Sequence, residues 1–208
     1  MATGNGNLIT TMDQLLGLYE APSDVSVAKE IDHVSDHYRA FIEAAPFFAL
    51  ATGGPDGLDC SPRGDAPGFV QVADPKTLMV PDRRGNNRID SLRNIMRDPR
   101  VALLFLIPGI GETIRVTGTA ALSIDPDLLA SFTVNGKLPC CVIVITVERV
   151  FYQCTKAIVR SKLWDPARHV DRACLPTTGT ILATQTAGRL GGAAHDRGQL
   201  ERTMAKLY

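Results

Sequence analysis

The sequence predicts a mainly β fold with helices, built as a six-stranded antiparallel barrel that is closed or split. Three observations support this prediction. Short apolar or alternating segments follow one another with turn residues between them, as at residues 53–57 and 108–111. A single helical pattern, at residues 87–97, interrupts these segments. A parallel sheet would instead require strands and helices to alternate along the chain.

The N-terminal part carries a helical pattern. Between residues 23 and 45 apolar side chains recur at steps of three and four, which predicts one amphipathic helix with Ser23 as its N-cap. A shorter helix is expected at residues 11–19. Pro46 ends the pattern, because proline disfavours helical backbone in the residue before it. We therefore expect a helical extension over residues 1–45.

The barrel is expected within residues 46–166. Residues 64–76 form a loop rich in glycine and proline, and Asp125 is the expected N-cap of a short helix. Residues 167–208 form a helical tail, with helices expected at 180–187 and 196–207. The six strands are expected at residues 47–52, 58–63, 77–80, 101–107, 113–123 and 140–154.

Composition and spacing exclude several classes of protein. The 22 Lys+Arg balance the 22 Asp+Glu, so no net charge would recruit nucleic acid or an anionic membrane. No apolar run reaches the roughly 20 residues of a membrane span and no signal-peptide pattern opens the chain, so we expect a cytoplasmic protein. The five cysteines lack CxxC spacing and are expected to be buried and reduced. His33 and His37 are four residues apart on the expected first helix, but without a third ligand they predict a surface face and no metal site.

Residues 78–95 are the most informative segment. Here a short strand leads into a helix, and Arg83, Arg84 and Arg88 lie around Gly85 and two asparagines. A helix N-terminus exposes unpaired backbone N–H groups, and arginines add ionic donors suited to phosphate oxygens. The segment therefore predicts a phosphate-sized anion site. The alternative is a solvated basic turn with ordinary helix capping.

Four blocks carry a family resemblance when they are taken in order. The blocks are Ser61-Pro62-Arg63-Gly64, the run from Pro81-Asp82-Arg83 to Asn86-Asn87-Arg88, the strand ETIRVTGTA at 112–120 and the segment CTKAIVRSKLW at 154–164. In this order they resemble the pyridoxamine 5′-phosphate oxidase-like family of FMN-binding split β-barrels, and within it a bacterial branch with a KAxxRSxLW-type segment. The resemblance covers about residues 42–166.

The resemblance implies a six-stranded antiparallel barrel of Greek-key type and a homodimer with FMN at the subunit interface. Arg63 would face the phosphate, and Arg83 or Arg84 would compensate for two asparagines that replace a serine and an arginine of the family pattern. Which arginine reaches the phosphate is left open. The residues that the resemblance assigns to the cofactor are Arg63, Val80, Pro81, Asp82, Arg83, Asn86, Asn87, Arg88, Thr113, Arg115, Lys156, Arg160, Ser161 and Trp164.

Within this list, two sets of residues are implied to contact the flavin ring. Val80 and Pro81 would lie beside its pyrimidine edge, while Thr113 and Arg115 would bind its polar atoms, where a cation stabilises the reduced flavin. The segment with Lys156, Arg160, Ser161 and Trp164 would come from the second subunit and close over the cofactor. Alternatively, Trp164 would be an anchor in the core or at an interface, and Lys156 and Arg160 would lie on a solvated helix face.

The resemblance implies an FMN-dependent oxidoreductase acting on an unidentified small molecule. A flavin accepts hydride at N5 with little acid–base help, so no catalytic residue is assigned. The Arg-Leu-His substrate clamp of the vitamin oxidase has no match in the tail, where Arg189 and Leu190 precede Gly191. A non-catalytic flavin-binding, storage or sensor protein and a deazaflavin-dependent reductase are the alternatives. Partners other than the second subunit and a small molecule are not expected.

Overall fold

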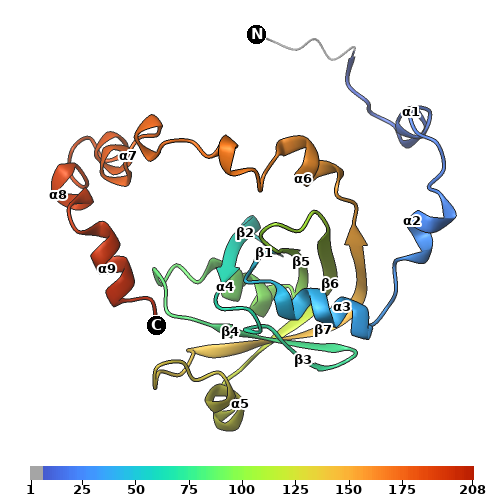
Figure 1. Cartoon of the computed structure of the whole chain (residues 1–208), viewed down its shortest axis with the longest axis horizontal. Coiled ribbons are helices and arrows are strands. Elements are labelled where there is room, and N and C mark those ends of the chain that lie inside the picture. The colour runs from blue at the N-terminus through green and yellow to red at the C-terminus, as the bar shows by residue number, and fades with distance from the viewer. Residues whose placement is uncertain (1–6) are drawn as a thin grey trace. The chain divides into compact units, whose positions relative to one another are not determined.

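The computed structural model describes residues 7–208, and the first six residues of the expected N-terminal extension lie outside this range (Figure 1). Two compact units are present, one ending at Glu30 and one running from Ile31 to Tyr208. The first contains the helices α1 (Met12–Leu16) and α2 (Asp24–Ala28). The domain boundaries expected at residues 45 and 166 stay a prediction.

The second unit is built on one antiparallel sheet in the order β2-β1-β5-β6-β7-β4-β3. This confirms the mainly β fold class with helices, but the sheet has seven strands where six were predicted. The additional strand is β3, which has four residues, pairs with β4 alone and is interrupted by a bulge, so it is too short to show an alternating pattern. The strands are β1 (Phe47–Gly54), β2 (Gly57–Gly64), β3 (Gln71–Asp74), β4 (Thr77–Asp82), β5 (Arg100–Leu106), β6 (Thr113–Ser123) and β7 (Cys141–Gln153).

The sheet curls until its two ends meet. Arg63 on β2, at one edge, forms an ion pair of 2.5 Å with Asp82 at the end of β4, next to the other edge. Among the described strands no ladder of backbone hydrogen bonds joins β2 to β3 or β4, so the barrel is split rather than closed. Phe48 fills its centre, with ring centroids 5.9 Å from Phe69 and 5.0 Å from Phe105.

The helices of this unit flank the sheet or follow it (Figure 1). The carboxylate of Asp125 caps α5 as expected, accepting the backbone N–H groups of Asp127 and Leu128. No helix within residues 7–208 combines the length and the apolar character needed to cross a membrane. The helices are α3 (Asp36–Ala44), α4 (Asp90–Arg97), α5 (Pro126–Ser131), α6 (Lys156–Ser161), α7 (Thr178–Gln185), α8 (Ala193–Asp196) and α9 (Gln199–Ala205).

The single helix predicted over residues 23–45 is wrong, because an extended segment separates α2 from α3. Ile31 exchanges two backbone hydrogen bonds with Val150 of β7, at 3.1 and 2.8 Å. Val34 is buried, and Ser35 then caps α3. The apolar repeat therefore marks where an extended segment packs on the barrel, not one continuous helix face.

The tail also differs from its prediction. The helix at 180–187 is confirmed as α7, but the helix expected at 196–207 is divided into α8 and α9. The division falls beside Gly198, whose φ of 67° is left-handed. Asp196 accepts hydrogen bonds from the hydroxyl of Thr177 and the backbone N–H of Gly179, at 2.7 and 2.8 Å, and so ties α8 back to α7.

The predictions for cysteine and histidine need correction. Only Cys141 is buried, and burial raises the pKa of its thiol to about 11. The other four cysteines are exposed, because they lie in loops or on the outer side of a strand rather than in the core. His33 and His37 are both exposed, as predicted, but His33 precedes α3 while His37 lies within it, so the two do not share a helix.

Candidate functional site

A cavity of about 430 Å³ lies where β2, the end of β4 and the start of α4 meet. We call it the arginine cavity. It brings together six of the predicted cofactor residues, namely Arg63, Asp82, Arg83, Asn86, Asn87 and Arg88. Its complete wall is formed by Asp59, Ser61, Pro62, Arg63, Asp82, residues 83–92 and Cys140.

Arg63 is the arginine of this cavity whose side chain most clearly lacks a hydrogen-bond acceptor. Its side chain is 19% exposed, and one terminal nitrogen donates to Asp82 at 2.5 Å. Its Nε is buried without a hydrogen-bond partner in the described structure. A buried N–H that lacks an acceptor costs about 1–3 kcal/mol. An anionic group in the cavity would supply that acceptor, so the residues present fit a phosphate.

The start of α4 offers further donors. Ile89 is the N-cap residue, and its side chain makes no capping hydrogen bond. The first backbone N–H groups of a helix have no partner within the helix, and they attract anions. In this segment the backbone turns left-handed not at Gly85 but at Asn87 (φ 60°) and Ile89 (φ 51°). For a β-branched residue this conformation is costly, and such strain is concentrated at functional sites.

Sequence reasoning missed a polar chain in the wall of the cavity. Ser91 Oγ donates to Asp59 at 2.7 Å, and the hydroxyl of Ser61 lies 2.7 Å from that of Ser91. Ser61 is two residues before Arg63, and strand alternation places both on one face of β2. That spacing could have identified it. Nothing in the local pattern singled out Ser91 from other residues in the first turn of α4.

The remaining arginines differ in their partners. Arg83 has three partners: its Nε donates to Asp65 at 3.0 Å, a terminal nitrogen donates to the Phe132 carbonyl at 2.7 Å, and its guanidinium lies 5.5 Å from the ring centroid of Tyr208. Arg88 is mostly exposed and pairs with Asp90 at 2.7 Å. Arg84 is exposed and makes no side-chain hydrogen bond or ion pair with the described residues.

The pKa of Asp65 reflects this arrangement. Burial alone would raise it, but hydrogen bonds from the Tyr208 hydroxyl, the Ala66 backbone N–H and Arg83 outweigh burial and lower it. Asp65 is therefore a stable anion that neutralises Arg83. Among the arginines of the cavity, Arg63 has a buried donor without a partner, and Arg84 forms no side-chain hydrogen bond or ion pair with the described residues.

The other predicted cofactor residues do not line the arginine cavity. Val80 and Pro81 are buried in β4. Thr113 is buried at the start of β6, opposite Gln153 in the ladder with β7. The side-chain oxygen of Gln153 is a second buried polar atom without a partner in the described structure, and sequence reasoning did not identify this residue. Arg115 is exposed, with its guanidinium 5.2 Å from the ring centroid of Phe151.

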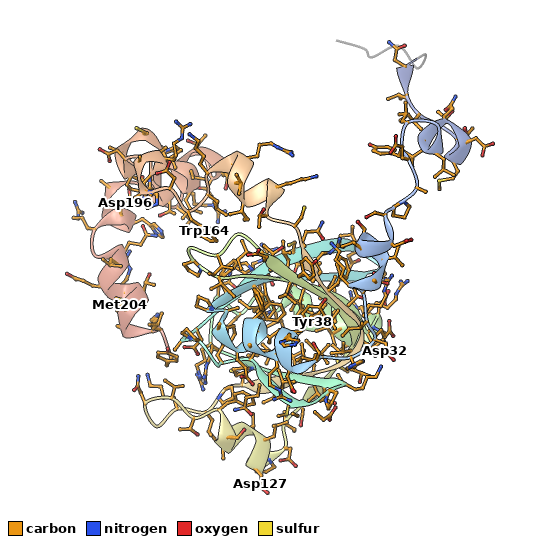
Figure 2. All side chains as sticks on the ribbon, turned by 45° about the vertical axis from the view of Figure 1, so that its right-hand side comes forward. Asp32, Tyr38, Asp127, Trp164, Asp196 and Met204 are labelled. Atoms are coloured by element: carbon orange, nitrogen blue, oxygen red, sulfur yellow. The ribbon has the colours of Figure 1, made fainter. Side chains whose placement is uncertain are left out.

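Helix α6 begins after Thr155, as predicted, and places Lys156, Arg160 and Ser161 on exposed surface. Trp164, labelled in Figure 2, follows this helix and donates its indole N–H to the Ile110 carbonyl at 2.7 Å. Within its own chain Trp164 thus fastens α6 to the turn between β5 and β6. No residue of β6 or α6 is among those that line the arginine cavity.

Several solved structures are similar to part of this chain. HupZ from Group A Streptococcus is 20% identical, with a TM-score of 0.47 over 58% of this chain and 94% of its own. General Stress Protein 26 from Bacillus anthracis is 19% identical, with a TM-score of 0.42 over 54% of this chain and 88% of its own. An FMN-binding protein from Syntrophomonas wolfei is 12% identical, with a TM-score of 0.43 over 55% of this chain and 82% of its own.

A search of curated proteins finds no match to this sequence. The sequence model of the pyridoxamine 5′-phosphate oxidase family matches residues 34–154, which include all seven strands and the whole wall of the arginine cavity. Because the match covers more than half of the 208 residues, the chain belongs to the pyridoxamine 5′-phosphate oxidase family.

Proposed function

We propose that this protein is an FMN-binding oxidoreductase that acts on a small molecule, with the FMN phosphate held in the arginine cavity. Family membership supports a flavin, and one observation supports its position: the buried, unpaired Nε of Arg63 lies in the wall of a cavity that an uncapped helix N-terminus also lines. When bound, the flavin would supply hydride transfer, and the protein would position and polarise it.

Each residue of the cavity has a defined task in this proposal. Arg63 binds the phosphate through Nε while Asp82 holds its guanidinium in place. The first N–H groups of α4 add uncharged donors. Asp82 is therefore an orienting residue rather than a ligand of the anion, because a carboxylate would repel it.

We further propose that the working site belongs to a homodimer. The outer face of the sheet exposes apolar side chains: Phe47 and Leu104 are 39% and 37% exposed and lie on the neighbouring strands β1 and β5. A second copy would bury this face. In this dimer Thr113 and α6 would complete the partner's site rather than their own, because neither lines the arginine cavity of its own chain.

The experiment compares FMN binding by the purified wild type and variants. Arg63→Ala should weaken binding by about 1.5–3 kcal/mol, or roughly 10- to 100-fold, because a charge-assisted contact is lost. Arg88→Ala should have a smaller effect, since Arg88 is exposed and already paired. Arg93→Ala is the control, being an exposed arginine of α4 outside the cavity wall.

The outcome that contradicts the cofactor assignment is a colourless wild type that takes up no FMN, or a folded Arg63→Ala variant with unchanged affinity. Circular dichroism melting establishes that each variant is folded. Turnover is tested separately by stopped-flow reduction of the bound flavin with NADH or NADPH. Reduction followed by reoxidation with an acceptor is expected, whereas flavin that neither nucleotide reduces would identify a binding protein.

A further inference from the structure

A second cavity, of about 860 Å³, adjoins the arginine cavity. We call it the tail cavity, because residues near the end of the described chain form one side of it. It shares Arg83, Arg84, Gly85, Asn87 and Cys140 with the arginine cavity. Its other walls are residues 136–139 and, from the tail, Ala205, Lys206 and Tyr208.

The charged side chains that line the tail cavity are all of one sign. Its charged side chains are Arg83, Arg84, Lys137 and Lys206, and no aspartate or glutamate is among the residues that line it. The arginine cavity, by contrast, includes three aspartates in its wall. Walls of a single sign raise the local concentration of ions of the opposite sign. The tail cavity is thus the more strongly cationic of the two.

Tyr208 holds the tail side of this cavity in place. Its hydroxyl donates to Asp65 at 2.6 Å, and its ring lies beneath the guanidinium of Arg83. Its carbonyl oxygen accepts a hydrogen bond from Lys137 at 2.7 Å. These contacts use Arg83 and Lys137. The side chains of Arg84 and Lys206 keep all their donors, as neither forms a hydrogen bond or ion pair within residues 7–208.

We propose that the tail cavity is a second binding site, which takes a small anionic molecule between Arg84 and Lys206 and is closed by residues 205–208. The inference rests on the proposed function in one respect, that the FMN phosphate occupies the adjoining arginine cavity. The volume lies in the range of small-molecule sites, about 300–1,000 Å³. The closing residues fall outside residues 34–154, which match the family, so they are a feature of this chain's own tail.

Tyr208 is a positioning residue in this proposal, because it acts by holding the wall rather than by binding the anion. Its hydroxyl and its ring make separate contacts, so two substitutions separate them. Tyr208→Phe removes the bond to Asp65 and keeps the ring beside Arg83. Tyr208→Ala removes both. Anion affinity should therefore fall in steps from tyrosine to phenylalanine to alanine.

The test uses isothermal titration calorimetry of the FMN-loaded full-length protein with phenyl phosphate as the probe. Lys206→Ala should weaken binding about tenfold, the effect of one lost charge-assisted hydrogen bond. Arg189→Ala, which removes a cation of the same tail that does not line the cavity, should change it less than twofold. Phenol, which has the ring but no phosphate, should not bind.

Failure of this inference is distinguishable from failure of the proposed function. If Lys206→Ala and Tyr208→Ala leave phenyl phosphate affinity unchanged while Arg63→Ala still loses FMN, the tail cavity is not the anion site and the flavin assignment stands. If Lys206→Ala instead loses FMN, the cavity holds the cofactor and the proposal is overturned. If the wild type takes up no FMN but binds phenyl phosphate with the expected dependence on Lys206, only the proposed function fails.

Discussion

Arginines of similar appearance in the sequence have different tasks in the structure. Arg83 is held by Asp65, a carbonyl and an aromatic ring, so it supports the loop and the tail. Arg63 is partly buried and has a buried, unpaired Nε, and Arg84 is exposed without a partner in the described structure. Free donors rather than charge alone therefore identify the candidate ligands of an anion.

Asp32 provides a test of pH dependence at the residue scale. It accepts a hydrogen bond from Lys76 at 2.8 Å and lies 2.9 Å from a ring nitrogen of His33, and these contacts lower its pKa from 3.8 to about 2. A pKa below the unfolded value means that the contacts stabilise the fold above about pH 4 and lose this contribution as the pH falls toward 2.

An NMR titration of the side-chain carboxyl of Asp32 measures this shift directly. The wild-type midpoint is expected near 2, and Lys76→Met should return it most of the way toward 3.8, because Lys76 is the largest cause. Added salt should act in the same direction, since the pair is exposed. Lys162→Met, at the C-cap of α6, serves as the control. A wild-type midpoint close to 3.8 would show that the contact with Lys76 does not form in solution.

The arginines also show which features of single residues the sequence predicts and which it does not. The four blocks placed Arg63 and residues 83–88 at one site, and the structure brings them into one cavity. Which arginine has free donors could not be predicted, because Asp65 and Tyr208, which engage Arg83, lie 18 and 125 residues from it in sequence. Long-range partners leave no local pattern.

At the scale of elements, the longest strands carry a bulge that bends the barrel. The ladder of β6 with β7 shifts register between Thr117 and Gly118, which leaves Glu148 without an opposing residue. Gly118 sits against the facing backbone there. An added Cβ would lie 2.0 Å from the carbonyl oxygen of Thr146, a distance that no side-chain adjustment can relieve.

Gly118→Ala is therefore expected to lower the free energy of unfolding by about 1–3 kcal/mol or more, because two backbone segments must move apart. Urea denaturation followed by circular dichroism measures the change. Gly85→Ala is the matched control and should stay within about 0.5 kcal/mol of the wild type, as nothing lies within 4 Å of the added atom. Equal stability of the two variants would mean that the register shift is absent in solution.

The elements that the sequence predicted well are those with a sustained local pattern. The hairpin of β5 and β6 and the strand β7 alternate over many residues, and their predicted limits are close to the observed ones. The segment around Ile31 and Val34 shows the opposite case. Its spacing is helical, but pairing with Val150 of a distant strand holds it extended. Tertiary pairing overrides such short patterns, and β3 was missed for a similar reason.

For the whole molecule, the central question is whether one chain or two build the cofactor site. The predicted residues fall into two groups, one around the arginine cavity and one at Thr113, Arg115 and α6. The apolar outer face of β1 and β5 offers a surface through which a second copy could join them. In the proposed dimer, flavin retention and association are therefore linked, so dilution that separates the subunits should release FMN.

Leu104→Lys tests this linkage. Leu104 lies on β5 opposite Ala49, so a lysine there would carry a charge into the proposed interface without a partner. An unpaired buried charge costs about 3 kcal/mol or more, so association should weaken at least 100-fold. Analytical ultracentrifugation with flavin absorbance should show a monomer that has lost FMN.

Ile124→Lys, at a residue that is 76% exposed just after β6, should leave a dimer with its flavin. A folded Leu104→Lys monomer that keeps FMN with wild-type affinity would assign the whole site to one chain, because a composite pocket cannot survive the loss of half its wall.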